Sequence, residues 1–404
     1  MFMDNHQQNC IAALMTAKTA AAISSIHLVG TDCENILKRI FKPLGNHHFD
    51  FSIGSILHGN IFDPSTLRSD ATGGRIIDEV IIGCEEVDCF SINCHGNPII
   101  VENILELLKK QGVKIAEAKE IIAYLARKKY SSMGCLTAGD NTIAIEAEIA
   151  VAESSTLDGA RIIQHQTKMG LLQSCQWWLE NLDSIQLDDI KAGAEQVLDD
   201  SKISSFFIKG AKIVIAGPPN SGKSTLFNRL CGKGKAIVTD IAGTTRDWLS
   251  AKIRLKKIEA EFFDTAGLDD ALSEKNIIDA QSQGQAVKLI KDADLVLFVV
   301  DSTNPAIVMA GLTELLNEIV VSNKCDLAGD LFADGLKISA KTGSGMRELI
   351  DEIETALGVV DFDMKKTVCF TDRQEKIVRQ IVSADKKEQI KKLIQELLKG
   401  DIFV

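Results

Sequence analysis

Short apolar runs alternate with longer amphipathic segments in the chain from Lys212 onwards. The runs have the length of strands, and the segments between them show the spacing of helices. This alternation predicts an α/β unit with a largely parallel sheet. The five expected strands are KIVIAG (212–217), FFDTAG (262–267), LVLFVVD (295–301), EIVVSNK (318–324) and LKISAK (336–341).

Helical patterns lie on both sides of this unit. Residues 121–208 hold few Pro or Gly and contain long amphipathic stretches at 143–168 and 184–200. After Gly358 the pattern is helical again, and it is nearly unbroken from Arg373 to Leu398. The sequence therefore predicts an all-α helical domain in two parts, with the α/β unit inserted between them.

The first 120 residues mix β-rich runs with one clear helix, which begins at Pro98 and ends at Gly112. The runs Ile23–Val29, Glu79–Ile82 and Val87–Ile92 are expected strands, so this region is predicted to be an α+β domain. The expected domains are residues 1–120 (α+β), 121–208 (helical, first part), 209–358 (α/β) and 359–404 (helical, second part, shortened).

Composition adds limits rather than a function. The 404 residues are 45% hydrophobic and 25% charged, which is ordinary for a globular protein of two or three domains. The net charge of −11 gives no electrostatic footprint for nucleic acid over the whole molecule, and it neither supports nor excludes an RNA substrate. A local basic patch at 127–129 is interpreted as a solvated helix face.

The ten cysteines are scattered, with no CxxC and no Cys/His group at zinc spacing. Reduced thiols in a cytoplasmic protein are therefore expected, rather than a disulfide framework. The N-terminus lacks the basic-then-apolar order of a signal peptide, and the best apolar run, Leu295–Val300, is too short to span a bilayer. We expect no membrane partner.

Five ordered motifs carry the chemistry of the α/β unit. Each supplies a different contact that one guanine nucleotide requires, and their order is that of a P-loop fold. The series predicts binding of GTP and GDP. The motifs are GPPNSGKS (217–224), TDIAGTTRD (239–247), DTAG (264–267), NKCD (323–326) and SAK (339–341).

Phosphate and Mg²⁺ contacts come from the first three motifs. The amides at the start of a helix and the Lys223 ammonium are expected to face the phosphates. Ser224 and Thr245 are the expected Mg²⁺ ligands, Asp264 holds the water shell of the ion, and the Gly267 amide senses the γ-phosphate. The residues expected to contact nucleotide or ions here are Asn220, Ser221, Gly222, Lys223, Ser224, Thr225, Thr239, Asp240, Ile241, Ala242, Gly243, Thr244, Thr245, Asp264, Thr265, Ala266 and Gly267.

The last two motifs predict specificity for guanine. Asp326 accepts hydrogen bonds from the guanine N1 and N2 donors, which adenine does not offer in the same pattern. Asn323 and Lys324 pack the base, and Ser339 and Ala340 complete the pocket.

Hydrolysis needs a device other than the usual Gln after DTAG, because Leu268 stands at that position. The Asn220 amide and backbone carbonyls of TDIAGTT are suitable ligands for a monovalent cation placed where an arginine finger would act. The alternative is that Asn220 only shapes the phosphate loop.

The run GPPNSGKSTLFNRLCGKGKAIVTDIAGTTRDWL (217–249) is similar to the tRNA modification GTPases of the MnmE (TrmE) family. Residues 16–30 resemble that family's TPPGxGGxxIxRISG, and His95–Pro98 resembles its GHGGP; GVKIA at 112–116 adds to the likeness. The resemblance implies a folate-type N-terminal domain, then a split helical domain with the GTPase domain inserted.

The resemblance also implies K⁺-dependent pairing of two GTPase domains in a homodimer. It implies that Asn220, Thr239, Ile241 and Thr244 are K⁺ ligands, that Ser224 and Thr245 bind Mg²⁺, and that Lys223 takes part in catalysis. For the water-orienting Glu of the family, Asp279 is the best-aligned position and Glu274 is the alternative.

Three departures affect the modification chemistry that the family performs. The chain ends in residues 400–404 (GDIFV) in place of a Cys-Ile-Gly-Lys tail, and Cys369 is expected to be a buried thiol rather than a substitute. His27 and Ser91 occupy the positions of an Arg and a Glu that bind formyl-tetrahydrofolate. The family's Lys has no counterpart, and Ala21 and Ala22 replace glycines. We expect the folate site to be dismantled, with His27 an ordinary strand histidine rather than a weak replacement.

Three hypotheses follow. The first is a GTPase that works with a flavoprotein partner on the wobble uridine of tRNA. The second is a diverged GTP-dependent switch or scaffold without the folate and cysteine chemistry. The third is a ribosome-assembly GTPase, against which the single GTPase domain and the lack of a basic RNA-binding domain count.

Overall fold

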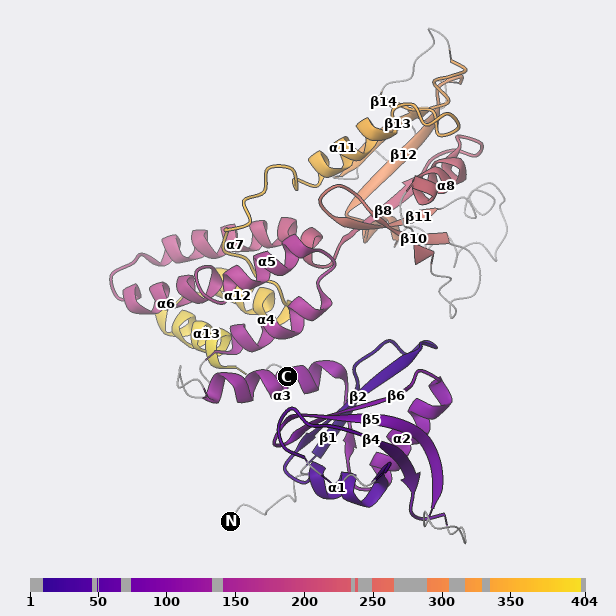
Figure 1. Cartoon of the computed structure of the whole chain (residues 1–404). Helices are drawn as coiled ribbons and strands as arrows, with labels where there is room; N and C mark the ends of the chain where they lie inside the picture. The colour runs from indigo at the N-terminus through magenta and orange to yellow at the C-terminus, as the bar shows by residue number, and fades with distance from the viewer. Residues whose placement is uncertain are drawn as a thin grey trace, which may run out of the picture. The chain divides into compact units, whose positions relative to one another are not determined.

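The computed structural model of the chain forms two compact units, residues 1–138 and 139–404, which are described one at a time (Figure 1). The sequence-based boundary between 120 and 121 falls near the start of α3 (Ala118–Ser132), a helix of the first unit. The structure describes residues 10–45, 49, 51–66, 74–132, 141–233, 237–238, 249–264, 289–304, 317–328 and 335–400.

A seven-stranded sheet forms the centre of the first unit, in the order β3-β4-β5-β6-β2-β1-β7. Neighbouring strands are antiparallel except for β1 and β7, which are parallel. The expected strands near 23–29, 79–82 and 87–92 are present as β2, β5 and β6. The strands are β1 (Cys10–Leu14), β2 (Ile23–Gly30), β3 (Phe41–Pro43), β4 (Ile56–Asp63), β5 (Arg75–Glu86), β6 (Cys89–His95) and β7 (Lys114–Ile115).

Helices cover both faces of this sheet, as Figure 1 shows. On one face α1 (Cys33–Ile40) and α2 (Pro98–Lys110) bury Ile36 and Ile104 in the main core of the unit. On the other face α3 packs Ile121 into a small separate cluster with Ala13, Val29 and Cys89. The α2 helix begins at Pro98, as expected, and the Asn97 side chain caps it by accepting from the amide of Ile99.

The α/β part of the second unit has a seven-stranded sheet in the order β14-β13-β12-β8-β11-β10-β9. All five expected strands are present and parallel, which confirms the P-loop type of fold. Two strands at one end of this sheet, β9 and β10, were not anticipated; β10 runs antiparallel to both of its neighbours. The strands are β8 (Ala211–Ala216), β9 (Ile237–Val238), β10 (Leu249–Arg254), β11 (Glu259–Asp264), β12 (Leu295–Asp301), β13 (Glu318–Asn323) and β14 (Leu336–Lys337).

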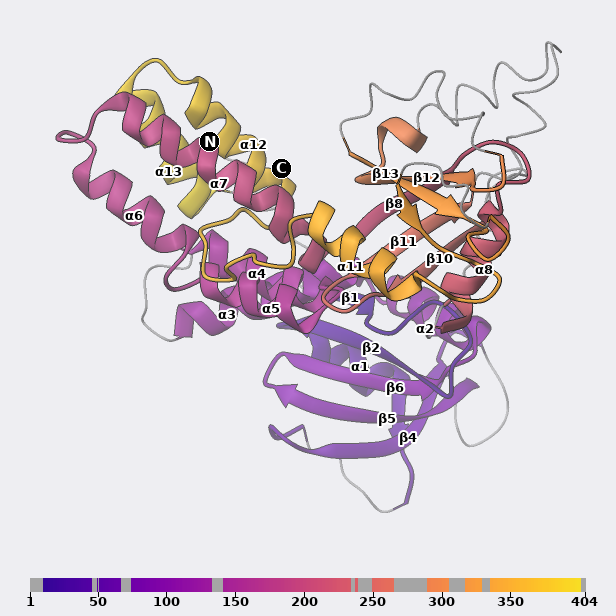
Figure 2. The same ribbon diagram turned by 90° about the horizontal axis from the view of Figure 1, so that it is seen from above.

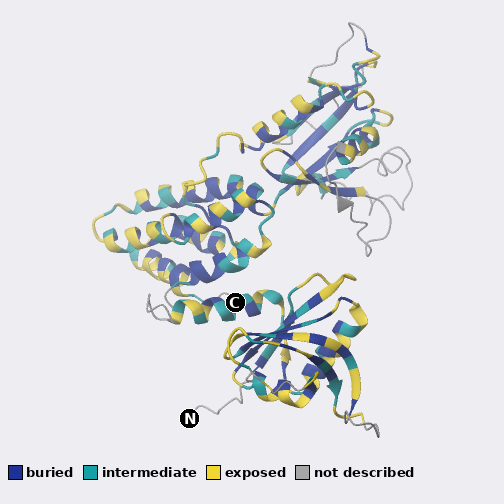
Figure 3. Ribbon diagram, viewed as in Figure 1, coloured by how far each residue is buried: buried dark blue, intermediate teal, exposed yellow. Residues whose placement is uncertain are grey.

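The central strands of this sheet are buried on both faces, as the dark β8 and β12 in Figure 3 show. Strands covered on both faces carry continuous apolar runs, which is why β12 reads LVLFVV without alternation. The helices α8 (Lys223–Lys233) and α11 (Met346–Ala356) bury Leu226 and Leu349 in the same core.

Six helices form the all-α part of the second unit. Figure 2 shows α7, α12 and α13 together, and α12 packs against α7 and α13, while α13 also contacts α4 and α6. Helices that follow the α/β part in the chain therefore pack with helices that precede it. The six are α4 (Thr142–Glu153), α5 (Leu157–Gln166), α6 (Leu171–Asn181), α7 (Leu187–Ile208), α12 (Asp372–Ser383) and α13 (Lys387–Lys399).

Two expected helices are each divided in the structure. The stretch 143–168 breaks at 154–156, where the Thr156 hydroxyl caps α5 by accepting from the amide of Gly159. The stretch from Arg373 to Leu398 breaks at 384–386, where Ala384 is extended. Folding back at this point lets the apolar faces of α12 and α13 reach one core, which a single straight helix does not permit.

A buried ion pair joins α4 to α12. Glu146, which is 2% exposed, accepts from Arg373 through both carboxylate oxygens, at 2.7 Å from Nε and 3.0 Å from Nη2. Gln374 and Thr371 donate to the same carboxylate at 2.7 and 3.1 Å. Arg373 also donates to the carbonyls of Glu396 and Leu397 near the end of α13. One arginine thus connects three helices.

None of the helices among the described residues combines the length and the apolar character needed to cross a lipid bilayer.

Replacing Glu146 with Ala leaves the Arg373 guanidinium buried without its counter-charge. We expect Glu146→Ala to lower the free energy of unfolding by about 3–5 kcal/mol, measured by urea denaturation. The control is Glu153→Ala on the same helix, where the side chain is exposed and we expect a change of no more than about 0.5 kcal/mol. Equal effects of the two substitutions would contradict the structural role of the buried pair.

Candidate functional site

The phosphate loop begins where β8 ends. Gly217 has a φ of +144°, and a Cβ at this position would lie 2.1 Å from the carbonyl oxygen of Val299, so only glycine is accommodated. The loop ends at Lys223, the first residue of α8. The backbone amides at the start of that helix, together with its dipole, favour an anion at the carboxyl edge of the sheet.

The Lys223 side chain is held inside this loop. It is 3% exposed, and its ammonium donates to the carbonyl oxygens of Gly217 at 2.9 Å and Pro218 at 3.0 Å. These carbonyls keep a buried cation hydrogen-bonded next to the helix N-terminus. The residue is therefore placed where the sequence predicts the phosphate-binding lysine.

Asn323 ties three loops together through its side-chain amide. Its Nδ2 donates to the Ser221 carbonyl at 2.9 Å, and its Oδ1 accepts from the Ala340 amide at 2.9 Å. A Cβ on Gly222 would lie 2.2 Å from Nδ2, so glycine is required for the loop to come this close. These contacts, called the Asn323 junction below, bring the expected phosphate-loop, base and SAK residues into one site.

Lys324 makes a second connection to the phosphate loop. Its φ is +63°, and its ammonium donates to the Asn220 carbonyl and to Asp301 Oδ2, both at 2.6 Å. Asn220 itself has a φ of +62°, which is uncommon for a residue with a side chain. The two bonds hold the Lys324 ammonium between the phosphate loop and the end of β12; packing of its stem against a base stays a prediction.

The pKa of Asp301 follows from these contacts. Partial burial favours the neutral acid, but the hydrogen bonds from Lys324 and Thr303 outweigh burial and hold the pKa below its ordinary value. The ion pair with Lys324 therefore stabilises the folded state fully above the ordinary carboxyl pKa. That stabilisation is lost as the pH falls through the lowered pKa.

The base end of the site is formed by the segments after β13 and β14. Asp326 is exposed, in a turn closed by the hydrogen bond from the Leu327 amide to the Lys324 carbonyl at 2.9 Å. Ser339 is buried, and its hydroxyl accepts from the Thr342 amide at 3.1 Å. The Asp326 carboxylate is thus open to solvent beside an ordered turn, as a base-reading group requires.

Two observations bear on whether a nucleotide with Mg²⁺ matches these residues. Among the described residues, the hydroxyl oxygens of Ser221 and Ser302 are buried and have no hydrogen-bond partner. Asp264 is buried at the end of β11, next to β8, and Ser224 lies in the first turn of α8. The unpartnered hydroxyls of Ser221, in the phosphate loop, and of Ser302, whose amide donates to the Asn323 carbonyl, suit a ligand rich in oxygen atoms.

Thr225, also expected to contact the nucleotide, is an exposed residue in the first turn of α8, and the other expected residues lie outside the described part of the chain. They include the second Mg²⁺ ligand, three of the four expected K⁺ ligands and both candidate catalytic carboxylates. These are Thr239, Asp240, Ile241, Ala242, Gly243, Thr244, Thr245, Thr265, Ala266, Gly267, Glu274 and Asp279.

Two contributors to the site were not anticipated. Asp301 forms an ion pair with Lys324 and is the last residue of β12. A polar residue at the carboxyl end of a central strand is a sequence feature from which its role could have been predicted. Arg229 on α8 donates to the carbonyl of Ala340 at 2.8 Å and also to that of Lys341. The contact could not be predicted from the sequence, because an arginine in an amphipathic helix is usually an ordinary surface residue.

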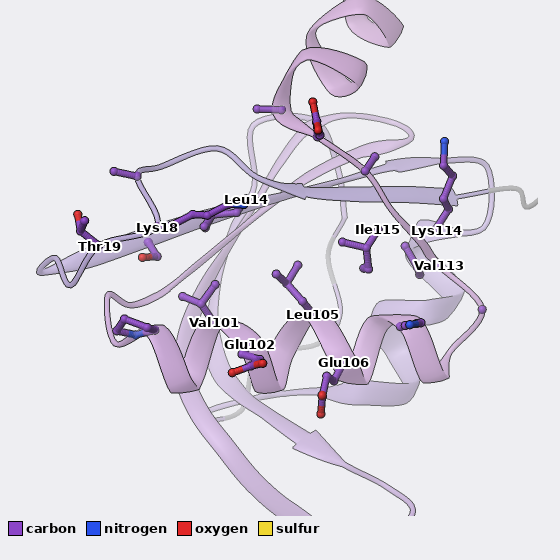
Figure 4. A pocket seen from close by; sticks show the side chains of 18 residues that line it. Leu14, Lys18, Thr19, Val101, Glu102, Leu105, Glu106, Val113, Lys114 and Ile115 are labelled. Atoms are coloured by element: carbon purple, nitrogen blue, oxygen red, sulfur yellow. The ribbon is translucent and has the colours of Figure 1, made fainter. Parts of the chain in front are cut away.

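A separate cavity lies in the first unit, with a volume of about 1060 Å³. Figure 4 shows Val101 and Leu105 of α2 pointing toward Leu14 and Ile115, and the lining also includes the charged residues Lys18, Glu102, Glu106 and Lys114. Its size and apolar floor are those of a small-molecule site.

The positions that correspond to a folate site lie elsewhere on the sheet of the first unit. His27 on β2 is the register partner of Ser91 on β6, and neither is among the described residues that line the cavity. The Cys369 thiol, expected to be buried, is 2% exposed, which confirms that expectation; burial raises the pKa of this thiol.

Comparisons with known proteins match the N-terminal unit and the α/β part to separate families. Residues 10–123 match the family model described as the GTP-binding protein TrmE N-terminus, and residues 212–324 match the 50S ribosome-binding GTPase. The tRNA modification GTPase MnmE of Thermoanaerobacter sp. (strain X514) is 29% identical over 390 residues, covering 85% of this chain and 81% of the relative. That of Lactococcus lactis subsp. lactis (strain IL1403) is 28% identical over 415 residues, covering 93% and 87%.

A solved structure also matches the chain in part. The G domain of the T. maritima FeoB iron transporter is 28% identical and covers 36% of this chain and 98% of its own, at a TM-score of 0.30.

Removing the Asn323 amide leaves the Ser221 carbonyl and the Ala340 amide without their partner. We expect Asn323→Ala to weaken GDP binding at least tenfold, because each lost contact costs about 1 kcal/mol or more. Calorimetric titration with GDP measures the change. The control is Asn317→Ala. Asn317 precedes β13, at the opposite end of the strand from Asn323, and the substitution removes one exposed hydrogen bond to the carbonyl of Asp294. Unchanged GDP affinity in Asn323→Ala would refute the junction.

Proposed function

We propose that this chain, a member of the MnmE/TrmE family, hydrolyses GTP in a cycle that serves modification of the wobble uridine of tRNA. One observation carries the GTP part of the proposal, namely that the Asn323 junction brings the phosphate loop, the NKCD segment and the SAK segment into one pocket. The tRNA part rests on the similarity to MnmE proteins along most of the chain.

The described residues bind and orient the nucleotide. The α8 amides and the Lys223 ammonium neutralise phosphate charge, and Lys223 exchanges its bonds to the Gly217 and Pro218 carbonyls for bonds to phosphate oxygens. Asp326 accepts from the guanine edge while the Lys324 stem covers the base. Ser224 and Thr245 would hold Mg²⁺, with Asp264 on its water shell; the ion neutralises the charge that develops during transfer.

A monovalent cation is the proposed activator of hydrolysis. Leu268 follows DTAG, so the chain has no Gln there to orient water. The Asn220 amide lies in the phosphate loop with its backbone fixed by the bond from Lys324 to its carbonyl. We propose that Asn220, Thr239, Ile241 and Thr244 bind K⁺ where an arginine finger would act.

The catalytic carboxylate is proposed to be Asp279, with Glu274 as the alternative. In the same scheme the active form is a homodimer, in which K⁺ lets two GTPase domains meet across their nucleotides. A flavoprotein is the proposed partner in the modification reaction.

The domain arrangement proposed for this cycle is a GTPase domain at 209–358 inserted in one helical domain formed by 121–208 and 359–404. The packing of α12 and α13 against α4, α6 and α7 supports it. So does the Glu146–Arg373 pair, because its two residues lie on opposite sides of the insertion. The N-terminal domain, proposed at 1–120, resembles the folate-type domain of the family.

A diverged switch or scaffold is the second candidate. The observation that favours it is the pair His27 and Ser91, which face each other where the family carries an Arg and a Glu for folate. A neutral hydroxyl in place of a carboxylate removes a charge-assisted hydrogen bond. On this candidate the GTPase cycle persists and folate-dependent modification does not.

Potassium should accelerate GTP hydrolysis by the full chain more than about tenfold over sodium at equal ionic strength, because a cation at this position neutralises transition-state charge. Phosphate release measures the rate. Asn220→Ala should lose the difference between K⁺ and Na⁺ but still bind GDP, while Asn228→Ala, an exposed residue of α8, should keep it. Equal wild-type rates in the two cations would remove the cation from the mechanism.

Expression in a bacterial strain that lacks its own MnmE should restore the modified wobble uridine in tRNA, measured by mass spectrometry of nucleosides. The control is Lys223→Ala, which removes the ammonium expected to bind the phosphates. This variant should not restore the modified uridine. If the wild-type chain hydrolyses GTP but restores no modification, the tRNA role is rejected and the switch candidate replaces it.

A further inference from the structure

We propose that His27, Glu85 and Cys89 form a Zn²⁺ site on the sheet of the first unit, on the face that α3 covers. One potential ligand atom from each of the three side chains lies within 4.8 Å of the other two. The site belongs to a different unit from the GTP pocket and does not depend on the proposed function.

The spacing of the three side chains is near that of a metal site. A His27 ring nitrogen, Nε2, is 3.6 Å from Glu85 Oε1, and Cys89 Sγ is 3.8 Å from Glu85 Oε2. Zinc bonds of about 2.0 Å to nitrogen and oxygen and about 2.3 Å to sulfur place neighbouring tetrahedral ligands about 3.3–3.6 Å apart. The measured separations of 3.6 and 3.8 Å therefore lie at or just above the separation that a shared zinc ion requires.

Strand register explains why residues distant in sequence meet here. On β2 and β6, His27 pairs with Ser91 and Val29 pairs with Cys89, so His27 and Cys89 lie on one face, one pair apart. A register shift in β5 between Cys84 and Glu86 leaves Glu85 unpaired. The bulge therefore directs Glu85 toward the other two side chains, as bulges often do beside functional sites.

The chemistry of the three groups suits zinc. A thiolate, a carboxylate and a neutral imidazole carry two negative charges, so Zn²⁺ makes the group neutral overall and lowers the penalty of burying it. The ring nitrogen of His27 nearest Glu85 is Nε2, and Nδ1 is buried without a hydrogen-bond partner among the described residues. Three protein ligands leave a fourth position for water or another ligand, which is typical of zinc sites that react rather than only hold structure.

Access and charge also suit a cation. Cys89 is 1% exposed, whereas the Glu85 side chain is 45% exposed, so an ion enters from the Glu85 side. Burial and then the nearby carboxylates of Glu85, Glu86 and Asp88 raise the pKa of Cys89 to about 12. The same negative field attracts a divalent cation, which displaces the thiol proton on binding.

A second thiol pair in the same unit must be distinguished from this site. Cys33 donates to Cys10 at an Sγ–Sγ distance of 3.3 Å, and both are buried. Neither residue belongs to the group of His27, Glu85 and Cys89, so the two possibilities separate by substitution.

The test uses the full chain stripped of metal, titrated with Zn²⁺ by calorimetry and with Co²⁺ by absorption. We expect one ion per chain, a thiolate-to-cobalt charge-transfer band and the strong visible bands of a tetrahedral site. Cys89→Ser should abolish the charge-transfer band and weaken Zn²⁺ binding by more than about 100-fold, since even outer contacts of metal sites contribute 10- to 100-fold. The control Cys94→Ser removes a buried thiol from the opposite face of β6 and should change neither.

Two further variants keep the test decisive if Cys89→Ser does not fold. Glu85→Gln alters a half-exposed side chain, so we expect normal thermal unfolding without metal and weakened Zn²⁺ binding. Cys33→Ser should bind Zn²⁺ and, in the separate titration, Co²⁺ as the wild-type chain does. Absence of Zn²⁺ binding to the wild-type chain, full binding by Glu85→Gln, or a charge-transfer band that disappears in Cys33→Ser would each overturn the proposal.

Discussion

The nucleotide site depends on one side-chain amide, that of Asn323. The phosphate loop, the end of β13 and the segment after β14 follow three different strands. The Cys325 amide already donates to the Ile338 carbonyl at 3.1 Å between the last two, but a further contact must join the phosphate loop to them. Asn323 does so by donating to Ser221 and accepting from Ala340 in a buried place where neither backbone group has water as an alternative. Gly222 is constrained in turn, because a larger residue would displace the amide. Lys324, the next residue, adds a second connection to the phosphate loop: its ammonium pairs with Asp301 and donates to the Asn220 carbonyl.

The sequence predicted the central elements of the fold well, because continuous apolar runs and glycine-rich turns are strong signals. It did not predict the two strands at one end of the α/β sheet or the points at which long helices are interrupted. The strands β9 and β10 lie at one end of the sheet, and β9 is only two residues long, which is too short to give a pattern. The division of the C-terminal helix at 384–386 has no Pro or Gly to mark it. It arises from tertiary packing of two apolar faces on one core, which local periodicity does not reveal.

The site shows the same contrast between local and distant information. Lys223, Asn323 and Lys324 could be predicted as nucleotide-binding residues because each belongs to a motif with a fixed chemical role. Arg229 was missed because its contact depends on how a helix lies against a distant loop. The group of His27, Glu85 and Cys89 was invisible for a related reason. Metal motifs are recognised by short spacing along the chain, whereas these three meet only through strand register and a bulge.

The Glu146–Arg373 pair has a consequence for the order of synthesis. Its partners are separated by 227 residues, so α4 leaves the ribosome long before Arg373 exists. At roughly 5–20 residues per second, the delay is on the order of 10 to 45 s. Throughout this interval the buried residues of α4 lack the C-terminal helices that cover them, although the last strand of the α/β part is complete at Lys337, before α12 begins. The nascent chain therefore carries an incomplete helical surface, with Glu146 lacking its counter-charge, until α12 and α13 have been synthesised.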